Sequence, residues 1–242
     1  MVTELGCGDA VVGGDYGAAM ATRQTGTLAP KLVPVTHGEL RPVSVEDFEA
    51  RDGDDIEAAE LASVRLTEVR WELRRRLDSS RLDEVAVRRW HARGAAFSDL
   101  VLERLDVLAL VAPESGWRDV VVRSSRIGSV ELFEANFRRV AFTGCKLGYL
   151  NLRDADLADV AFTDCVIEDL DLMRAKAKRV SLAGCRIGRL EVANTRLEDF
   201  DLRGATFADI SGLEGLRGVT ISTDQLLDLA PVLAARLGLK VE

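Results

Sequence analysis

The chain has 242 residues, of which 47% are hydrophobic and 30% charged, so it is long and apolar enough to bury a core and is not disordered throughout. Its net charge of -8 argues against nucleic acid as a direct partner. No apolar run reaches the roughly 18 residues needed to cross a bilayer, the N-terminus lacks the features of a signal peptide, and four cysteines are too few for a disulfide-stapled secreted domain. We therefore expect a cytoplasmic protein with no membrane partner.

The first two segments in chain order precede any repeat. Residues 1–38 hold seven glycines and no sustained period, which predicts a flexible N-terminal segment. Residues 39–53 predict an acidic N-terminal cap, because the stretch 39–60 contains nine acids against Arg41 and Arg51 and accounts for -7 of the net charge. Within it, Ser44 followed by Asp47 resembles a capping box. We therefore expect a short helix near 45–50 that covers the N-terminal end of the repeat domain that follows.

A period of five residues governs the chain from 80 to 209. Every fifth residue from Ser80 to Ala205, and the residue two positions after each of these, is uncharged, although 30% of all residues are charged. Five is neither the 3.6-residue period of a helix nor the 2-residue period of a strand, so the chain must turn a corner every five residues.

A second period of twenty residues is superimposed on the first. Cys145, Cys165 and Cys185 fall in one column, and the next column contains only leucines at the same positions. Four pentapeptides therefore make one four-sided coil. Successive coils stack at about 4.8 Å, the spacing of parallel strands, so that each column becomes a ladder of similar side chains inside the coil.

This pattern resembles the pentapeptide repeat family, whose consensus is A-(D/N)-L-x-x. Residues 155–159 read Ala-Asp-Leu-Ala-Asp, and residues 135–139 read Ala-Asn-Phe-Arg-Arg. The resemblance covers 80–209 without a break in register, and it implies a right-handed, quadrilateral, parallel β-helix. We predict an all-β solenoid of about seven coils over 54–212, with a short N-terminal cap and a C-terminal α-helical cap.

Both ends of the repeat have distinctive sequences. Upstream, the five-residue period continues from 54 to 73, and one extra residue falls near 72–79, where we expect a bulge with the three arginines 74–76 outside. Downstream, residues 213–242 predict a helical cap that starts at Ser222 and is kinked or divided by Pro231. Four leucines, which we expect on one helical face, cover the last coil or form a homodimer: Leu226, Leu229, Leu233 and Leu237.

The sequence predicts no catalytic residue, no cofactor and no metal site. The three cysteines at spacing twenty occupy inward positions, so we expect a buried thiol ladder, whereas Cys7 is the cysteine expected to be reactive. The only histidines are His37 and His91, and neither has a nucleophile at a fixed spacing. A helix without long inserted loops offers no cleft, and we predict that the protein is not an enzyme.

Charge is banded along the repeat, and this gives the candidate partner surface. One coil is rich in acids and the next is rich in bases: Asp154, Asp156, Asp159, Asp164, Glu168, Asp169 and Asp171, then Arg174, Lys176, Lys178 and Arg179. The bands either compensate each other across stacked coils or recognise a partner. Some pentapeptide repeat proteins imitate duplex DNA and bind DNA gyrase, which is the alternative function. The basic band fits a phosphate mimic poorly, so we favour a rigid protein-binding scaffold.

Overall fold

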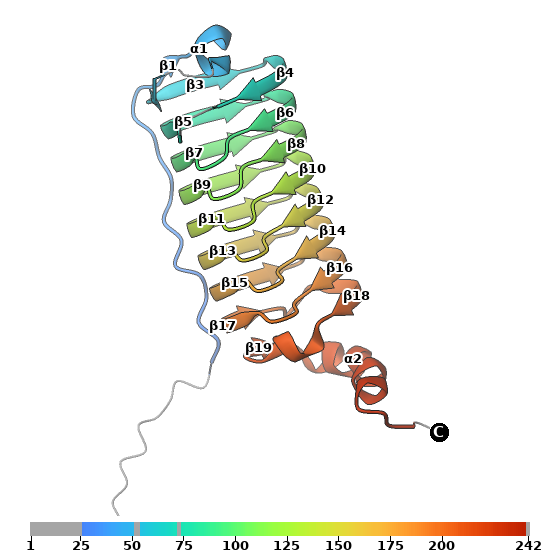
Figure 1. The fold of residues 1–242 in the computed structure, drawn as a ribbon. Coiled ribbons are helices and arrows are strands. Elements are labelled where there is room, and N and C mark those ends of the chain that lie inside the picture. The colour runs from blue at the N-terminus through green and yellow to red at the C-terminus, as the bar shows by residue number, and fades with distance from the viewer. Residues whose placement is uncertain (1–25, 51–53, 72–73, 241–242) are drawn as a thin grey trace, which may run out of the picture.

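The computed structural model describes residues 26–50, 54–71 and 74–240, and most of them form a parallel β-solenoid (Figure 1). The solenoid has about nine turns rather than about seven, and strand pairing continues outside the predicted range 54–212, through Arg41–Pro42 and Val219–Thr220. Two α-helices, α1 (Val45–Glu49) and α2 (Thr223–Arg236), lie at its opposite ends. The predicted all-β solenoid with a cap at each end is confirmed.

Two parallel sheets run the length of the solenoid. The first contains β1 (Arg41–Pro42), β2 (Ile56–Glu57), β3 (Ala59–Ala62), β5 (Arg76–Asp83), β7 (Ala96–Glu103), β9 (Gly116–Arg123), β11 (Asn136–Thr143), β13 (Asp156–Thr163), β15 (Lys176–Ala183), β17 (Arg196–Asp201) and β19 (Val219–Thr220). The second contains β4 (Arg65–Arg70), β6 (Ala86–His91), β8 (Asp106–Val111), β10 (Arg126–Glu131), β12 (Lys146–Asn151), β14 (Val166–Asp171), β16 (Arg186–Glu191) and β18 (Thr206–Ser211). A short 3-10 helix, η1 (Leu213–Leu216), follows the last coil.

Each coil has four sides of five residues, which we name from the coil 155–174. Side 1 is 155–159, side 2 is 160–164, side 3 is 165–169 and side 4 is 170–174, together with the residues at multiples of twenty from them. β13 forms sides 1 and 2, β14 forms side 3, and side 4 is mostly turn. From β5 to β18, paired Cα atoms lie 20 residues apart. The pairs of the first coil with the second are 21 apart, as in Ile56 with Leu77 and Val69 with Trp90, whereas β1 and β19 pair at offsets of 18 and 19 residues. One extra residue therefore lies after Trp71.

The interior is a set of side-chain ladders. Cys145, Cys165 and Cys185 are each 1% exposed and carry free thiols that point to backbone carbonyls such as those of Thr143 and Thr163. A hydrogen bond to the neighbouring sulfur and burial raise the pKa of Cys145, so its thiol stays neutral. These cysteines fill a column that needs small side chains. Cys7 lies outside the described residues.

Aromatic rings are concentrated in the N-terminal coils. The rings of Phe97 and Trp117 stack with centroids 4.2 Å apart, and the ring planes of Trp117 and Phe137 are nearly parallel, with centroids 5.9 Å apart. Further up, Trp71 and Trp90 meet edge to face at 5.1 Å. All three tryptophans of the chain lie at or before position 117. Tryptophan fluorescence therefore reports on the N-terminal coils alone.

The N-terminal cap is α1, the short helix predicted near 45–50. The Ser44 hydroxyl accepts a hydrogen bond from the Asp47 N–H, as expected for an N-cap, and Phe48 is fully buried against Trp71 and Trp90. The aromatic ring thus closes the open end of the first coil.

Arg75 corrects the prediction that the arginines 74–76 lie outside. Its side chain occupies an inward position and only 4% of the residue is exposed. The guanidinium lies over the Trp71 ring at 5.2 Å and donates to the carbonyls of Asp47 (2.7 Å), Phe48 (3.2 Å), Ala50 (2.9 Å) and Asp54 (2.8 Å). The carbonyl end of α1 carries partial negative charge, so a buried cation is stable there. Burial lowers the pKa of Arg75, and nearby Asp55 opposes this shift.

The C-terminal cap is α2, which begins with a capping box formed by Ser222 and Gln225. The buried Gln225 amide donates to the carbonyls of Leu202 (2.6 Å) and Ala205 (2.7 Å), which closes the last coil. The leucines predicted on one face separate. Leu229 is buried and Leu233 packs against the core, whereas the other two, Leu226 and Leu237, are 49% and 74% exposed. Pro231 lies inside the helix without dividing it, and a homodimer through this helix stays a prediction.

The N-terminal strap, residues 26–40, was not anticipated. We predicted that 1–38 is a flexible segment; residues 1–25 lie outside the described part, but 26–38 run in extended form along the whole solenoid, from the α2 end to the α1 end (Figure 1). The Thr27 and Thr220 hydroxyls are hydrogen-bonded at one end, and Arg41 pairs with Ala59 at the other. The strap has no period because it crosses the strands instead of joining them.

Candidate protein-binding surface

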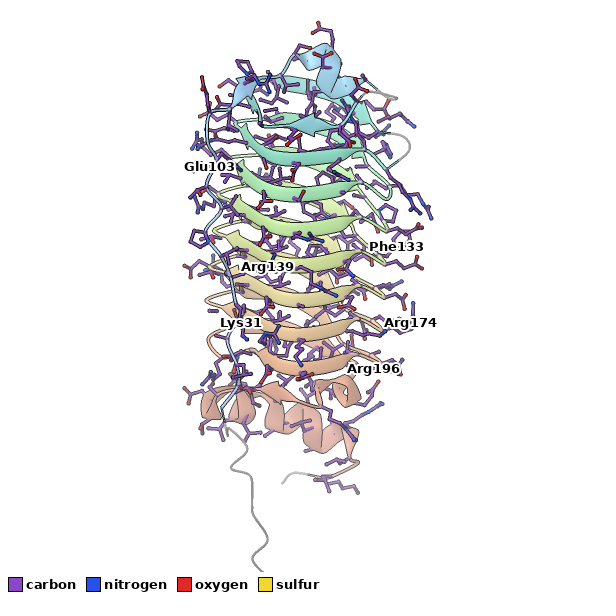
Figure 2. All side chains as sticks on the ribbon, turned by 90° about the vertical axis from the view of Figure 1, so that its left-hand side faces the viewer. Lys31, Glu103, Phe133, Arg139, Arg174 and Arg196 are labelled. Carbon is purple, nitrogen blue, oxygen red and sulfur yellow. The ribbon has the colours of Figure 1, made fainter. Side chains whose placement is uncertain are left out.

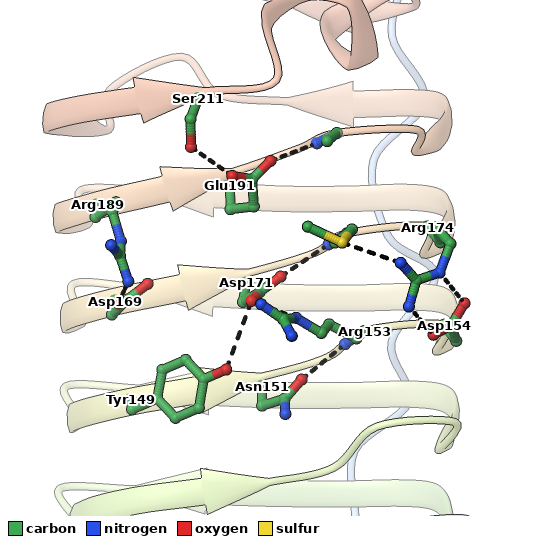
Figure 3. Close-up of polar contacts among 12 residues, drawn as sticks. Tyr149, Asn151, Arg153, Asp154, Asp169, Asp171, Arg174, Arg189, Glu191 and Ser211 are labelled. Atoms are coloured by element: carbon green, nitrogen blue, oxygen red, sulfur yellow. Dashed lines mark hydrogen bonds and ion pairs between the residues drawn. The ribbon is translucent and has the colours of Figure 1, made fainter.

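Opposite charges of neighbouring coils pair directly. This agrees with the first explanation of the charge bands, in which the bands compensate each other across stacked coils. Arg179 binds Asp159 through two hydrogen bonds of 2.6 and 2.7 Å, and Arg174 binds Asp154 in the same way at 2.8 and 2.7 Å. Arg189 pairs with Asp169 on a third side (Figure 3). Because partners differ by twenty in sequence, the repeat itself brings the acid band against the basic band.

The predicted candidate residues do not form one patch. Asp154, Asp171 and Arg174 lie on side 4, whereas Glu168 and Asp169 lie on side 3 and Asp164 on side 2. The remaining five are on side 1: Asp156, Asp159, Lys176, Lys178 and Arg179. The set encircles the solenoid, so a single partner surface can contact only part of it.

Side 4 has a polar column with a structural role (Figure 3). Asp171 accepts hydrogen bonds from the Met173 N–H (3.0 Å) and from Arg153 (2.6 Å), and Glu191 accepts from the Ala193 N–H (2.8 Å) and from Ser211 (2.6 Å). The strandless turn of side 4 leaves these N–H groups for side chains. These carboxylates therefore hold the turns, which explains their position without any catalytic task.

Side 1 has two hollows. The strap runs along the border of this side (Figure 2). The first hollow has a volume of about 490 Å³; Ala96 and Gly116 form its floor, and Arg76, Arg118 and Arg138 line it. The second, of about 510 Å³, lies nearer the C-terminus. It is lined by Lys176, Lys178, Arg196 and Arg217, among others. Small residues at outward positions create the first hollow, because neighbouring coils carry long side chains there.

The strap is held by the corner between sides 1 and 2. The Leu28 N–H donates to Asp199 (3.1 Å), the Lys31 N–H donates to Asp159 (2.8 Å), and His37 Nε2 lies 2.7 Å from the Asp99 carbonyl oxygen. The hydrogen bond from Arg179 and the one from the Lys31 N–H lower the pKa of Asp159. The strap nevertheless exposes apolar side chains, including 42% of Leu28 and 48% of Val33. It is attached at intervals rather than continuously buried.

We expect Asp159→Ala to loosen the strap. The substitution removes the acceptor of the Lys31 N–H, so trypsin should cut after Lys31 several-fold faster, as followed by mass spectrometry. The matched control is Asp119→Ala, because Asp119 also binds an arginine, Arg139, through two hydrogen bonds but has no hydrogen bond to the strap among the described residues. Equal acceleration in both variants would contradict the prediction.

The pH dependence of this contact follows from the same carboxylate. The folded-state pKa of Asp159 lies below the ordinary aspartate value of 3.8, so the ionised group is favoured by folding. Its stabilisation is complete above that value and is lost as the pH falls through the lower, folded-state pKa. The strap should therefore stay bound at neutral pH.

Sequence reasoning missed several cations that line the two hollows of side 1, among them Arg118 and Arg196. Reading the outward columns at intervals of twenty would have placed both on side 1 beside Lys176, which the prediction did include. Within the described ranges, no group of three or more histidine, cysteine, aspartate or glutamate side chains is placed to hold a metal ion. No helix in those ranges is long and apolar enough to cross a membrane.

Comparison with known proteins agrees with the repeat. Residues 115–192 match the family model described as pentapeptide repeat region, and no curated protein matches the chain. Among solved structures, full-length QnrB1, a plasmid-mediated fluoroquinolone resistance protein, has 16% identity and a TM-score of 0.38, covering 82% of this chain and 95% of that one. A trypsin-treated QnrB1 has 16% identity and a TM-score of 0.34, covering 76% and 99%. Residues 115–192 are therefore a pentapeptide repeat region, and the five-residue register continues without a break on either side of them.

Proposed function

We propose that this chain is a non-catalytic, rigid scaffold that binds a protein partner along side 1. The two hollows on side 1 are the observation that carries this proposal, because a protein interface needs a surface into which partner side chains can insert. Stacked coils with paired charges make the surface stiff, so a partner meets it without a large ordering cost.

Two further features support a binding role over catalysis. From Arg76 to Ser211 each coil takes twenty residues, so no long loop is inserted at a corner to build a deep cleft. The carboxylates of side 4 are occupied with turn N–H groups and arginines. These carboxylates are therefore not free to act on a substrate.

Site-specific photocrosslinking tests the proposal. Asn136 lies in the first hollow and Lys146 lies on side 3, and both are exposed. Each is replaced in turn with p-benzoylphenylalanine in the source cell. We expect one discrete adduct from position 136, abolished by excess unmodified protein, and no such adduct from position 146. A discrete adduct from position 146 alone would reject side 1 as the binding surface.

The alternative proposal is a duplex-DNA mimic that binds DNA gyrase. Side 4 favours it, since it carries six acids against three bases between 91 and 194: Glu114, Glu131, Glu134, Asp154, Asp171 and Glu191, against Arg93, Arg153 and Arg174. Three of the six acids, however, pair with these arginines, which leaves little uncompensated charge to imitate phosphates. A mimic should inhibit supercoiling by gyrase at stoichiometric amounts, and an unchanged rate of supercoiling would exclude it.

A further inference from the structure

Side 1 carries several cations outside the ion pairs of the described residues. Arg118, Lys176 and Arg196 are exposed and form no ion pair with any other residue of the described ranges. Their neighbours do pair: Arg138 with Asp156 (3.1 Å), and Lys178 with Glu198. Since unpaired charge on this side lies in or beside the two hollows, side 1 presents positive potential where it is concave.

We infer that side 1 binds an extended, acidic segment of a partner polypeptide, laid lengthwise beside the strap. This inference rests on the proposed function and adds the chemistry of the partner. Charge complementarity selects acidic side chains, and the two hollows in line along the solenoid select a segment that runs along its axis rather than across it.

The strap shows that an extended chain fits this direction. Its bonds from Leu28 to Asp199 and from Lys31 to Asp159 cover two coils with three residues. Two coil spacings of about 4.8 Å match three residues of extended chain at about 3.3 Å each. The same arithmetic applies on side 1, where Arg118 and Arg196 are four coils, or about 19 Å, apart. A segment of about six residues spans them, and its alternate side chains present about three carboxylates to three cations.

Single-stranded nucleic acid fits side 1 less well. A phosphate chain carries one charge on every nucleotide, whereas the cations around the two hollows alternate with four carboxylates, which would repel an unbroken anionic chain: Asp78, Asp99, Asp156 and Glu198. The aromatic side chains of this side, Phe97, Trp117 and Phe137, are buried, so they cannot stack on bases. Acids spaced along a peptide can avoid these four carboxylates.

The experiment measures binding of a fluorescein-labelled peptide of twelve residues that alternates aspartate and threonine. Fluorescence anisotropy should show saturable binding that weakens as salt increases. The triple variant Arg118→Glu, Lys176→Glu and Arg196→Glu should weaken this binding by about tenfold or more.

The matched control reverses the charge of three cations of side 3 that line neither hollow of side 1: Arg126→Glu, Lys146→Glu and Arg186→Glu. This control should change the affinity by less than about threefold. All six residues are exposed and unpaired among the described residues, and circular dichroism checks that both variants fold.

Three results would overturn the inference: no saturable binding of the peptide, equal losses in the two triple variants, or tighter binding of a twelve-residue oligothymidine than of the peptide. The last would assign side 1 to single-stranded nucleic acid. Failure of the peptide together with a discrete adduct from position 136 would reject the acidic partner segment and leave the scaffold function standing. If position 136 gives no discrete adduct and the peptide does not bind, both the scaffold function on side 1 and the acidic partner segment are rejected.

Discussion

Arg75→Met should lower the free energy of unfolding of the N-terminal coils by about 3–5 kcal/mol. The methionine can fill much of the volume but donates no hydrogen bond, so the carbonyls of Asp47, Ala50 and Asp54 lose this donor, whereas the Phe48 carbonyl keeps the one from Trp71 Nε1–H. Each buried carbonyl left without a partner costs about 1–3 kcal/mol, and water can reach some of these three carbonyls. Urea unfolding followed by tryptophan fluorescence measures the loss, because Trp71 and Trp90 lie directly against Phe48 of α1.

The neighbouring Arg76→Met is the control for this prediction. Arg76 is exposed, and its side chain makes no hydrogen bond within the described ranges, so its loss should change stability by about 0.5 kcal/mol or less. Similar values for the two variants would show that the buried guanidinium does not hold the cap.

Phe137→Ala should cost about 3–5 kcal/mol, the usual range for a fully buried phenylalanine. The ring is 1% exposed and stacks on Trp117, and Leu157 of the next coil lies below it in the same ladder. A rigid stack of coils cannot collapse around the space that the ring leaves, which places the expected cost in the upper part of the range for core substitutions. Urea unfolding monitored by circular dichroism tests it.

Phe133→Ala on side 4 of the preceding coil is the matched substitution. Phe133 is half-buried in an outward column, and the same change there should cost about 1 kcal/mol or less. If both phenylalanines cost the same, the assignment of inward and outward columns would be wrong.

The sequence determines the interior of this protein far better than its exterior. Inward positions must be uncharged and must fit a ladder, so the period between 80 and 209 identifies the sides and the core from the residues alone. The burial of Arg75 was not predicted, because this residue places a charge in an inward position. There the first coil ends against α1, and backbone carbonyls take the place of apolar neighbours. The rule of an uncharged interior holds only where another coil lies on both sides.

The candidate surface was predictable only in part. The acid and basic bands are visible in the sequence, and the spacing of twenty indicates that they pair. The hollows on side 1 depend on Ala96 and Gly116 being small beside longer neighbours in space, and the strap depends on contacts between residues more than a hundred positions apart, such as Lys31 and Asp159. Neither arrangement leaves a local signal in the chain.

The strap also fixes the number of coils. Repeat proteins commonly gain or lose whole repeats, because each coil contacts only its neighbours and the stack tolerates any length. Here one segment reaches from Ala59 in the first coil to Thr220 in the last, so a duplicated coil would shift the strap out of register with every aspartate beyond the insertion. An added coil would need one or two added strap residues in the same event. The same tether joins the two ends of the molecule, where repeat proteins begin to fray, so unfolding of one end is coupled to the other instead of proceeding coil by coil.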